Sequence, residues 1–113
     1  MKTNKEIARF SLAGVQYSDY QKCRQLKAGT NVTFTWERSN RFDDMAIRVD
    51  CNGIKIGYVP KGEHQDLLHD CREEGTKVQG KIAAFNKNNP TWHMITVAVE
   101  AKQKTKAESD IRF

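Results

Sequence analysis

The most chemically distinctive residues form one polar run near the middle of the chain. Asn40, Arg41, Phe42, Asp43 and Asp44 place an amide, a planar cation, an aromatic ring and two carboxylates in consecutive positions. Arginine can hold a phosphate through two parallel hydrogen bonds, and an exposed ring can stack on a base. A carboxylate repels a phosphate but accepts a hydrogen bond from a hydroxyl. We therefore expect this run to bind a nucleic-acid strand whose free 3′-hydroxyl faces Asp43.

Further candidates for the same surface lie before and after this run. Tyr17 and Tyr58 each follow strand-like sequence, where a ring could stack on a base for about 1–3 kcal/mol. Lys61 and Arg38 are candidate phosphate contacts. The predicted nucleic-acid-binding residues are Tyr17, Asn40, Arg41, Phe42, Asp43, Tyr58 and Lys61.

Several of these residues also have a purely structural interpretation. Phe42 could plug one end of a barrel. Asn40 could bond a base edge or brace the loop, and bracing is the better interpretation. Asp43 or Asp44 could cap a turn by accepting backbone N–H groups, as Asp often does before a strand.

The strongest local signal is a β-hairpin directly after the polar run. Apolar and charged residues alternate over 47–51 and again over 54–56, and Asn52-Gly53 separates the two runs. Asn-Gly supplies the two positive φ angles that a type I′ turn requires. Pro60 cannot donate to a central ladder, so the second strand should end before it. The sequence therefore predicts a rigid hairpin with the polar loop at its open end, directly before the first strand. Loops held in this way by a rigid sheet often carry binding groups.

The remaining elements are short. Alternating patterns predict strands at 7–15, 31–37, 78–84 and 95–99. A thin apolar stripe predicts a helix from Ser18 or Asp19 through Ala28, and an amphipathic pattern predicts a second helix over 61–75 that ends at Gly75. Neither helix is placed to build a repeated βαβ unit. The chain is therefore predicted to be mainly β with two short helices, as a small six-stranded antiparallel barrel.

Three blocks of the sequence resemble the HIRAN domain family, in the family's order and over about residues 8–100. They cover residues 12–17, 37–49 and 56–61. The central block reads as an acidic-basic pair, an Asn, an aromatic residue followed by Asp, then Ala-Ile and a β-branched residue. The resemblance implies a modified OB-type barrel that binds single-stranded DNA without catalysis. In larger relatives such domains are attached to helicase-like translocases or nucleases.

The resemblance also implies roles for individual residues. The Asp at the position of Asp43 is similar to the family's reader of a 3′ end, with Phe42 and Tyr17 flanking the last bases. The family often has Pro where Arg41 stands, so a phosphate contact by Arg41 is inferred from this chain alone. Two further motif positions are matched, by Asn40 and Lys61.

Size, charge and cysteine usage limit the class of protein. The 113 residues suffice for one domain, expected over 7–101 between a flexible start (1–6) and a flexible basic tail (102–113). Net charge is +5, with −3 on the segment 61–75 and +8 on the rest, which fits a basic face that meets a polyanion. No apolar run could span a membrane, and no signal-peptide pattern is present. Cys23, Cys51 and Cys71 lack a Cys-x-x-Cys pair, which favours a reducing, cytoplasmic location.

These observations lead to three candidate functions. The first is a non-catalytic module that binds single-stranded DNA at a free 3′-hydroxyl, in DNA repair or fork processing, with a helicase or nuclease as a possible partner and no cofactor. The second is a small nuclease in which Asp43, Asp44 and Asp50 hold Mg²⁺ near Lys55. The third is a protein-interaction module that uses the acidic helix 61–75. No metal site is predicted, because His64 and His69 lie on different helix faces.

Overall fold

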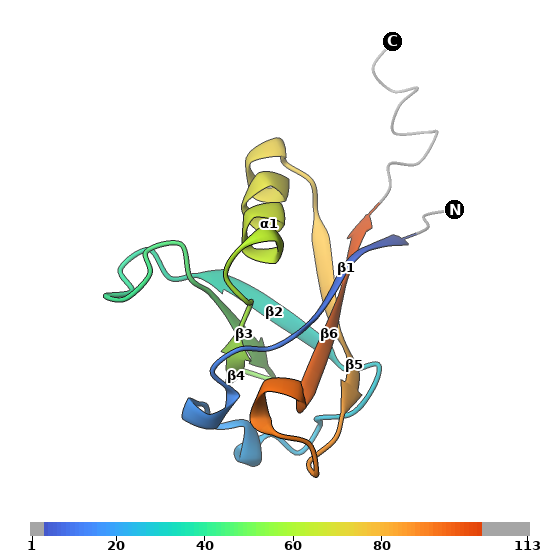
Figure 1. Cartoon of the computed structure of the whole chain (residues 1–113). Coiled ribbons are helices and arrows are strands. Elements are labelled where there is room, and N and C mark those ends of the chain that lie inside the picture. The colour runs from blue at the N-terminus through green and yellow to red at the C-terminus, as the bar shows by residue number, and fades with distance from the viewer. Residues whose placement is uncertain (1–3, 103–113) are drawn as a thin grey trace.

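The computed structural model describes residues 4–102, which form one six-stranded antiparallel sheet with an α-helix packed against it (Figure 1). Neighbouring strands follow the order β1-β6-β5-β2-β3-β4. The mainly β class and the six antiparallel strands predicted from the sequence are confirmed. The strands are β1 Asn4–Ser11, β2 Asn31–Trp36, β3 Ile47–Cys51, β4 Ile54–Tyr58, β5 Val78–Phe85 and β6 Ile95–Lys102.

The predicted closed barrel is not formed by strand pairing within residues 4–102. β1 and β4 are the two edges of the sheet, and they meet at one isolated bridge. Ala13, which follows β1, exchanges two backbone hydrogen bonds with Tyr58, each 2.8 Å long. The described residues therefore form an open sheet. The segment after β1 bonds β4 at this bridge and again through the Asp19 N–H, which donates to the Lys55 carbonyl at 3.1 Å.

The hairpin of β3 and β4 forms as predicted. Asn52 has φ 52° and Gly53 has φ 78°, the positive angles that an Asn-Gly turn supplies. One irregularity follows, because the register passes from Asp50 opposite Lys55 to Val49 opposite Gly57. Ile56 is thus an extra residue, a β-bulge that changes which side chains of β4 share a face.

The predicted acidic helix is α1, Glu63–Glu74, and Figure 1 shows it standing beside β2 and β3. It ends at Gly75, whose φ of 76° is left-handed. The Thr76 N–H then bonds the Cys71 carbonyl at 2.9 Å, which completes a Schellman-type end. The buried face carries Gln65, Leu68, His69 and Cys71, so two polar side chains lie beneath the helix.

The predicted helix from Ser18 or Asp19 to Ala28 is wrong. Only a 3₁₀ turn forms there, at Tyr20–Lys22. Apolar residues that recur every third position fit three residues per turn better than 3.6, and they give an α-helix too narrow an apolar stripe to bury. The Ser18 hydroxyl instead donates to the Val15 carbonyl at 2.7 Å.

The first strand is displaced from its predicted range of 7–15. It begins at Asn4 and ends at Ser11, and a left-handed Gly14 (φ 67°) then leads into a 3₁₀ turn, Val15–Tyr17. Residues 4–6, expected to precede the domain, therefore belong to β1, and Lys102 is the last residue of β6. The rest of the expected flexible tail lies outside the described residues.

The core is formed mainly by side chains of the strands and of the turn after β1, and Leu68 of α1 packs against them. Its fully buried side chains come from every strand except β1 and β2 and from the turn after β1. No helix among the described residues is long and apolar enough to cross a membrane. The largest fully buried side chains of the core are Leu12, Val15, Val49, Cys51, Ile56, Ile82, Ile95, Val97 and Val99.

Candidate nucleic-acid interface

A cavity of about 460 Å³ opens where four segments of the chain meet. These are the turn after β1, the loop before β3, the end of β4 with the residues that follow, and the first turns of α1. Its volume lies in the range of small-molecule sites. The cavity is lined by Ala13, Gly14, Tyr17, Asn40, Phe42, Asp43, Ala46, Lys55, Tyr58, Val59, Lys61 and Gln65. Six of the seven predicted binding residues are therefore brought together, and Arg41 is the exception.

Asn40 builds the loop that carries the other groups. Its side-chain oxygen accepts hydrogen bonds from the Phe42 N–H (2.9 Å) and the Asp43 N–H (3.0 Å). Its amide nitrogen donates to Glu37 at 3.0 Å. The interpretation of Asn40 as a brace is confirmed.

Glu37 links this loop to the opposite wall of the cavity. The Oε1 that accepts from Asn40 also accepts from the Tyr58 hydroxyl at 2.8 Å, and Oε2 lies 3.5 Å from Arg48. Partial burial would raise the pKa of Glu37. The hydrogen bonds from Asn40 and Tyr58, together with the charges of Arg48 and Lys55, outweigh burial and hold the pKa below its ordinary value. One carboxylate thus fixes both the loop and the Tyr58 ring.

Asp43 is held in place through both carboxylate oxygens. Oδ2 accepts from the Gln65 amide at 2.9 Å, and Oδ1 accepts from the Met45 N–H at 3.0 Å. The Gln65 bond, then the Met45 N–H, then the nearby Lys61 charge lower the pKa of Asp43. The turn-capping interpretation of Asp43 is therefore also correct. A carboxylate has about four lone-pair sites, so Asp43 can still accept a hydrogen bond from a ligand.

Gln65 is a cavity residue that sequence reasoning missed. It lies in the first turns of a helix that is acidic in sequence, and it is 7% exposed. The apolar pattern of the helix pointed to His64 and Leu67 as inward positions. The signal that could have identified Gln65 is its place one helical turn before His69, which is buried on the same face.

Two lysines bring positive charge to the cavity. Lys61 was predicted, whereas Lys55 was considered only for a metal-dependent enzyme. Lys55 and Tyr58 are three residues apart, an odd spacing that would place them on opposite faces of a regular strand. The bulge at Ile56 brings them to one side, and the Lys55 Nζ lies 4.6 Å from the Tyr58 ring centroid.

Two aromatic rings stand at the rim. Tyr17 is 83% exposed and Phe42 is 93% exposed, so the interpretation of Phe42 as a barrel plug is wrong. Tyr17 ends a 3₁₀ turn that is anchored by the buried Val15. Exposed rings beside a basic cavity are suited to stacking on bases, because every base offers a π-face.

The remaining cations and acids lie elsewhere. Arg41 is exposed and does not line the cavity, and Arg38 stacks on Trp36 instead. Asp50 is buried and pairs with Arg48 at 3.1 Å. Within residues 4–102, no group of three or more His, Cys, Asp or Glu side chains is arranged to hold a metal ion.

The histidines of α1 have structural contacts. His69 is buried, with Nε2 2.8 Å from the Met45 carbonyl oxygen. The His64 ring lies 5.0 Å from the ring of Phe10. The two side chains therefore serve different parts of the packing.

The fold and the cavity define a small antiparallel β domain with a basic, aromatic-rimmed pocket at one end of its hairpin. The sequence profile of the HIRAN domain matches residues 6–102, which is most of the chain. The chain therefore belongs to the HIRAN domain family.

Two solved structures share the fold. A crystal structure of a protein from Lactobacillus plantarum superposes with a TM-score of 0.73 at 18% identity, covering 92% of this chain and 100% of that one. The HIRAN domain of human HLTF superposes with a TM-score of 0.69 at 21% identity, covering 96% of this chain and 88% of that one. No curated protein sequence matches this chain.

Proposed function

We propose that this chain is a non-catalytic module that binds single-stranded DNA and recognises its free 3′-hydroxyl end. HIRAN domains bind DNA, and the cavity described above supplies the groups for reading an end. In this proposal Asp43 accepts a hydrogen bond from the 3′-hydroxyl. Lys55 and Lys61 bind the last phosphates, and Tyr17 and Phe42 stack on the last bases.

The observation that supports this proposal most directly is the carboxylate of Asp43 in a cavity that also contains two lysines. A carboxylate at that position weakens binding to a phosphate along a continuous backbone. It favours a hydroxyl that carries no phosphate, because only the hydroxyl can donate a hydrogen bond to it. Charge at this site therefore selects a strand terminus over the middle of a strand.

The shape of the domain supports the same mode of binding. OB-type barrels bind single strands on a basic surface with aromatic platforms. We propose that this open sheet, joined at the Ala13–Tyr58 bridge, is a modified form of that barrel. Repair or replication-fork processing beside a helicase or nuclease is the setting in which an exposed 3′ end has to be recognised.

The nuclease alternative has less support from the arrangement of its residues. Asp50 is paired with Arg48 and buried away from the cavity, so it does not join Asp43 and Asp44. Incubation of a labelled oligonucleotide with Mg²⁺ or Mn²⁺ tests this alternative. Cleavage that is lost in Asp43→Ala would favour the enzyme over the binding module.

The test of the proposal is fluorescence anisotropy with oligonucleotides that differ only in a 3′-hydroxyl or a 3′-phosphate. The measurement is repeated at two salt concentrations. We expect tighter binding of the 3′-hydroxyl form at both, with the affinity of each falling as salt rises. Equal affinity for the two ends would show that the terminus is not what the cavity reads.

A further inference from the structure

A second cationic feature lies outside the cavity, around the ring of Trp36. The guanidinium carbons of Arg38 and Arg72 lie 4.2 Å and 4.3 Å from the centroid of this indole. The ring is therefore in cation–π contact with two arginines, one from the loop after β2 and the other from α1.

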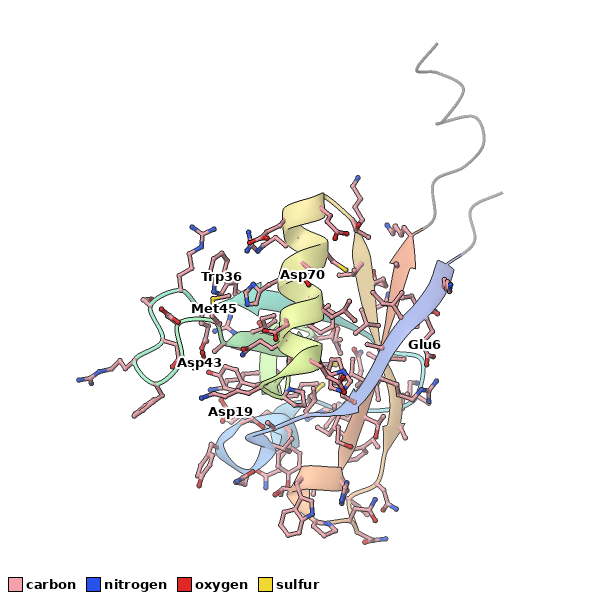
Figure 2. The ribbon with its side chains drawn as sticks, turned by 45° about the horizontal axis from the view of Figure 1, so that its top comes forward. Glu6, Asp19, Trp36, Asp43, Met45 and Asp70 are labelled. Atoms are coloured by element: carbon pink, nitrogen blue, oxygen red, sulfur yellow. The ribbon has the colours of Figure 1, made fainter. Side chains whose placement is uncertain are left out.

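The indole is also fixed at its edges. Its Nε1 donates to the Asp44 carbonyl at 2.7 Å, and the His69 ring meets it edge-on at a centroid distance of 4.9 Å. Asp44 follows Asp43 directly, so the stack is attached to the loop that presents the proposed end-reading carboxylate. Figure 2 shows Trp36, Met45 and Asp43 along the same side of the molecule.

This arrangement is better suited to binding phosphate than to stacking on a base. Two guanidiniums already contact the Trp36 ring and compete with a base for it. Stacking restricts each guanidinium but leaves its outer N–H groups available for the two parallel bonds that a phosphate accepts. Within residues 4–102, Arg38 is exposed and has no ion pair, while Arg72 has one ion pair, with Glu73 at 3.6 Å.

Two hollows adjoin Trp36, and each is lined by one of the two arginines. One of about 250 Å³ is lined by Trp36, Arg72 and apolar residues beneath α1. The other, of about 480 Å³, runs from Trp36 and Arg38 to Asn40. Asn40 also lines the end-binding cavity, so the second hollow and that cavity are neighbours across one loop.

We propose that Arg38 and Arg72, held on Trp36, form a second phosphate-binding surface for nucleic acid that extends beyond the segment in the cavity. This inference rests on the proposed function, because a strand end held at Asp43 would bring further phosphates past the Asn40 loop. An acidic peptide could satisfy the same guanidiniums, but nothing in the adjoining cavity would anchor it there.

The test compares two DNA ligands that share one 3′ end. The first is a trinucleotide with a 3′-hydroxyl, which is long enough for the cavity alone. The second is a partial duplex with the same three-nucleotide 3′ overhang. The variant is Arg38→Gln/Arg72→Gln, and the matched control is Arg9→Gln/Arg24→Gln, which removes the same charge from residues that line neither the cavity nor the Trp36 hollows.

We expect the test variant to bind the trinucleotide within about twofold of wild type and the partial duplex roughly tenfold more weakly. The slope of log binding constant against log salt concentration for the duplex should become shallower by nearly two. Each phosphate contact contributes about 0.9 to that slope, and two contacts are removed. The control should change both ligands equally and by less. Arg38→Lys/Arg72→Lys keeps the charge but loses the planar guanidinium. Its affinity for the partial duplex should lie between those of the test variant and the control variant.

The proposed surface would be contradicted if the test and control variants had equal affinities for the partial duplex. An equal loss of affinity for both ligands in the test variant would also contradict it. So would loss of binding to a poly-glutamate peptide in the test variant while duplex binding is unchanged. Failure of the proposed function would look different, because the wild-type protein would bind trinucleotides with a 3′-hydroxyl and a 3′-phosphate equally well. Matching thermal melts of all variants confirm that each is folded.

Discussion

Replacement of Gly57 by alanine tests how the two walls of the cavity are joined. Gly57 precedes Tyr58 in β4 and has φ +155°, a backbone conformation that side chains rarely adopt. A Cβ at this position would lie 2.9 Å from the Ala13 carbonyl oxygen and 3.1 Å from the Leu12 Cβ. That carbonyl is the acceptor of the Tyr58 N–H in the bridge between the sheet edges. The backbone of Ala13 has to move away, so the bridge is lost.

The size of the effect follows from two costs. Backbone strain of this kind costs about 1–3 kcal/mol, and overpacking costs a further 1–3 kcal/mol or so. A combined loss of about 3 kcal/mol corresponds to a decrease in Tm of roughly 12–24 °C for a domain of this size. Binding should weaken as well, because Tyr17 and Tyr58 are positioned from opposite sides of the bridge.

The matched control is Gly53→Ala in the Asn-Gly turn. Gly53 has φ +78°, but a Cβ there would meet nothing within 4 Å. It should cost only the left-handed strain of about 1–2 kcal/mol and leave the cavity intact. Thermal melts followed by circular dichroism measure stability, and anisotropy with a 3′-hydroxyl oligonucleotide measures binding. Equal decreases in Tm for the two variants would show that the close approach at Ala13 does not hold the edges together.

Three further predictions concern the cavity itself. Tyr17→Ala and Phe42→Ala should each weaken single-strand binding by about 1–3 kcal/mol, measured by anisotropy, with little change in Tm because both rings are exposed; unchanged affinity would remove the stacking role. Glu37→Gln should lower the unfolding free energy in urea by about 1–2 kcal/mol, since it weakens three contacts of one carboxylate; wild-type stability would mean that these bonds contribute nothing net. Asp43 and Glu37 have pKa values in the folded state below their ordinary values of 3.8 and 4.5. The stability that the two carboxylates contribute is therefore present above the ordinary pKa values and is lost as pH falls through the lower folded-state values. The Tm should change little from about pH 8 to 5 and fall below that, and the Tm of Glu37→Gln should fall less than that of wild type.

Most of the strands could be predicted because local chemistry determines them. Asn52-Gly53 specifies its turn through two positive φ angles, and the alternation in β2 separates Val32, Phe34 and Trp36 from two threonines. Gly75 marks the end of α1 for the same reason. In these segments the local preference and the tertiary structure agree.

The features that could not be predicted depend on tertiary contacts. The bulge at Ile56 has no marker in the strand pattern, yet it decides that Lys55 faces the cavity. Gln65 was overlooked because a buried amide beneath an acidic helix becomes favourable only when Asp43 is there to accept its hydrogen bond. The region 18–28 has too little apolar surface on one side for a helix, so packing around Cys23 determines its path.

The cluster of predicted binding residues arose for a simple reason. The run from Asn40 to Asp43 is contiguous and precedes a strand, which favours placing several of its members at one site. Arg41 belongs to the same run, but it is exposed and does not line the cavity. Sequence order alone gives no indication of that difference.

In the proposed mode of binding, the Asp43 carboxylate distinguishes the end of a strand from its interior. The most direct measurement is the ratio of Kd values for 3′-phosphate and 3′-hydroxyl oligonucleotides, taken for wild type and for Asp43→Asn. A charge-assisted hydrogen bond contributes about 1.5–3 kcal/mol, so the ratio should fall by roughly ten- to a hundredfold in the variant. An unchanged ratio, in a variant that melts like wild type, would contradict the assignment of Asp43 as the group that reads the 3′ end.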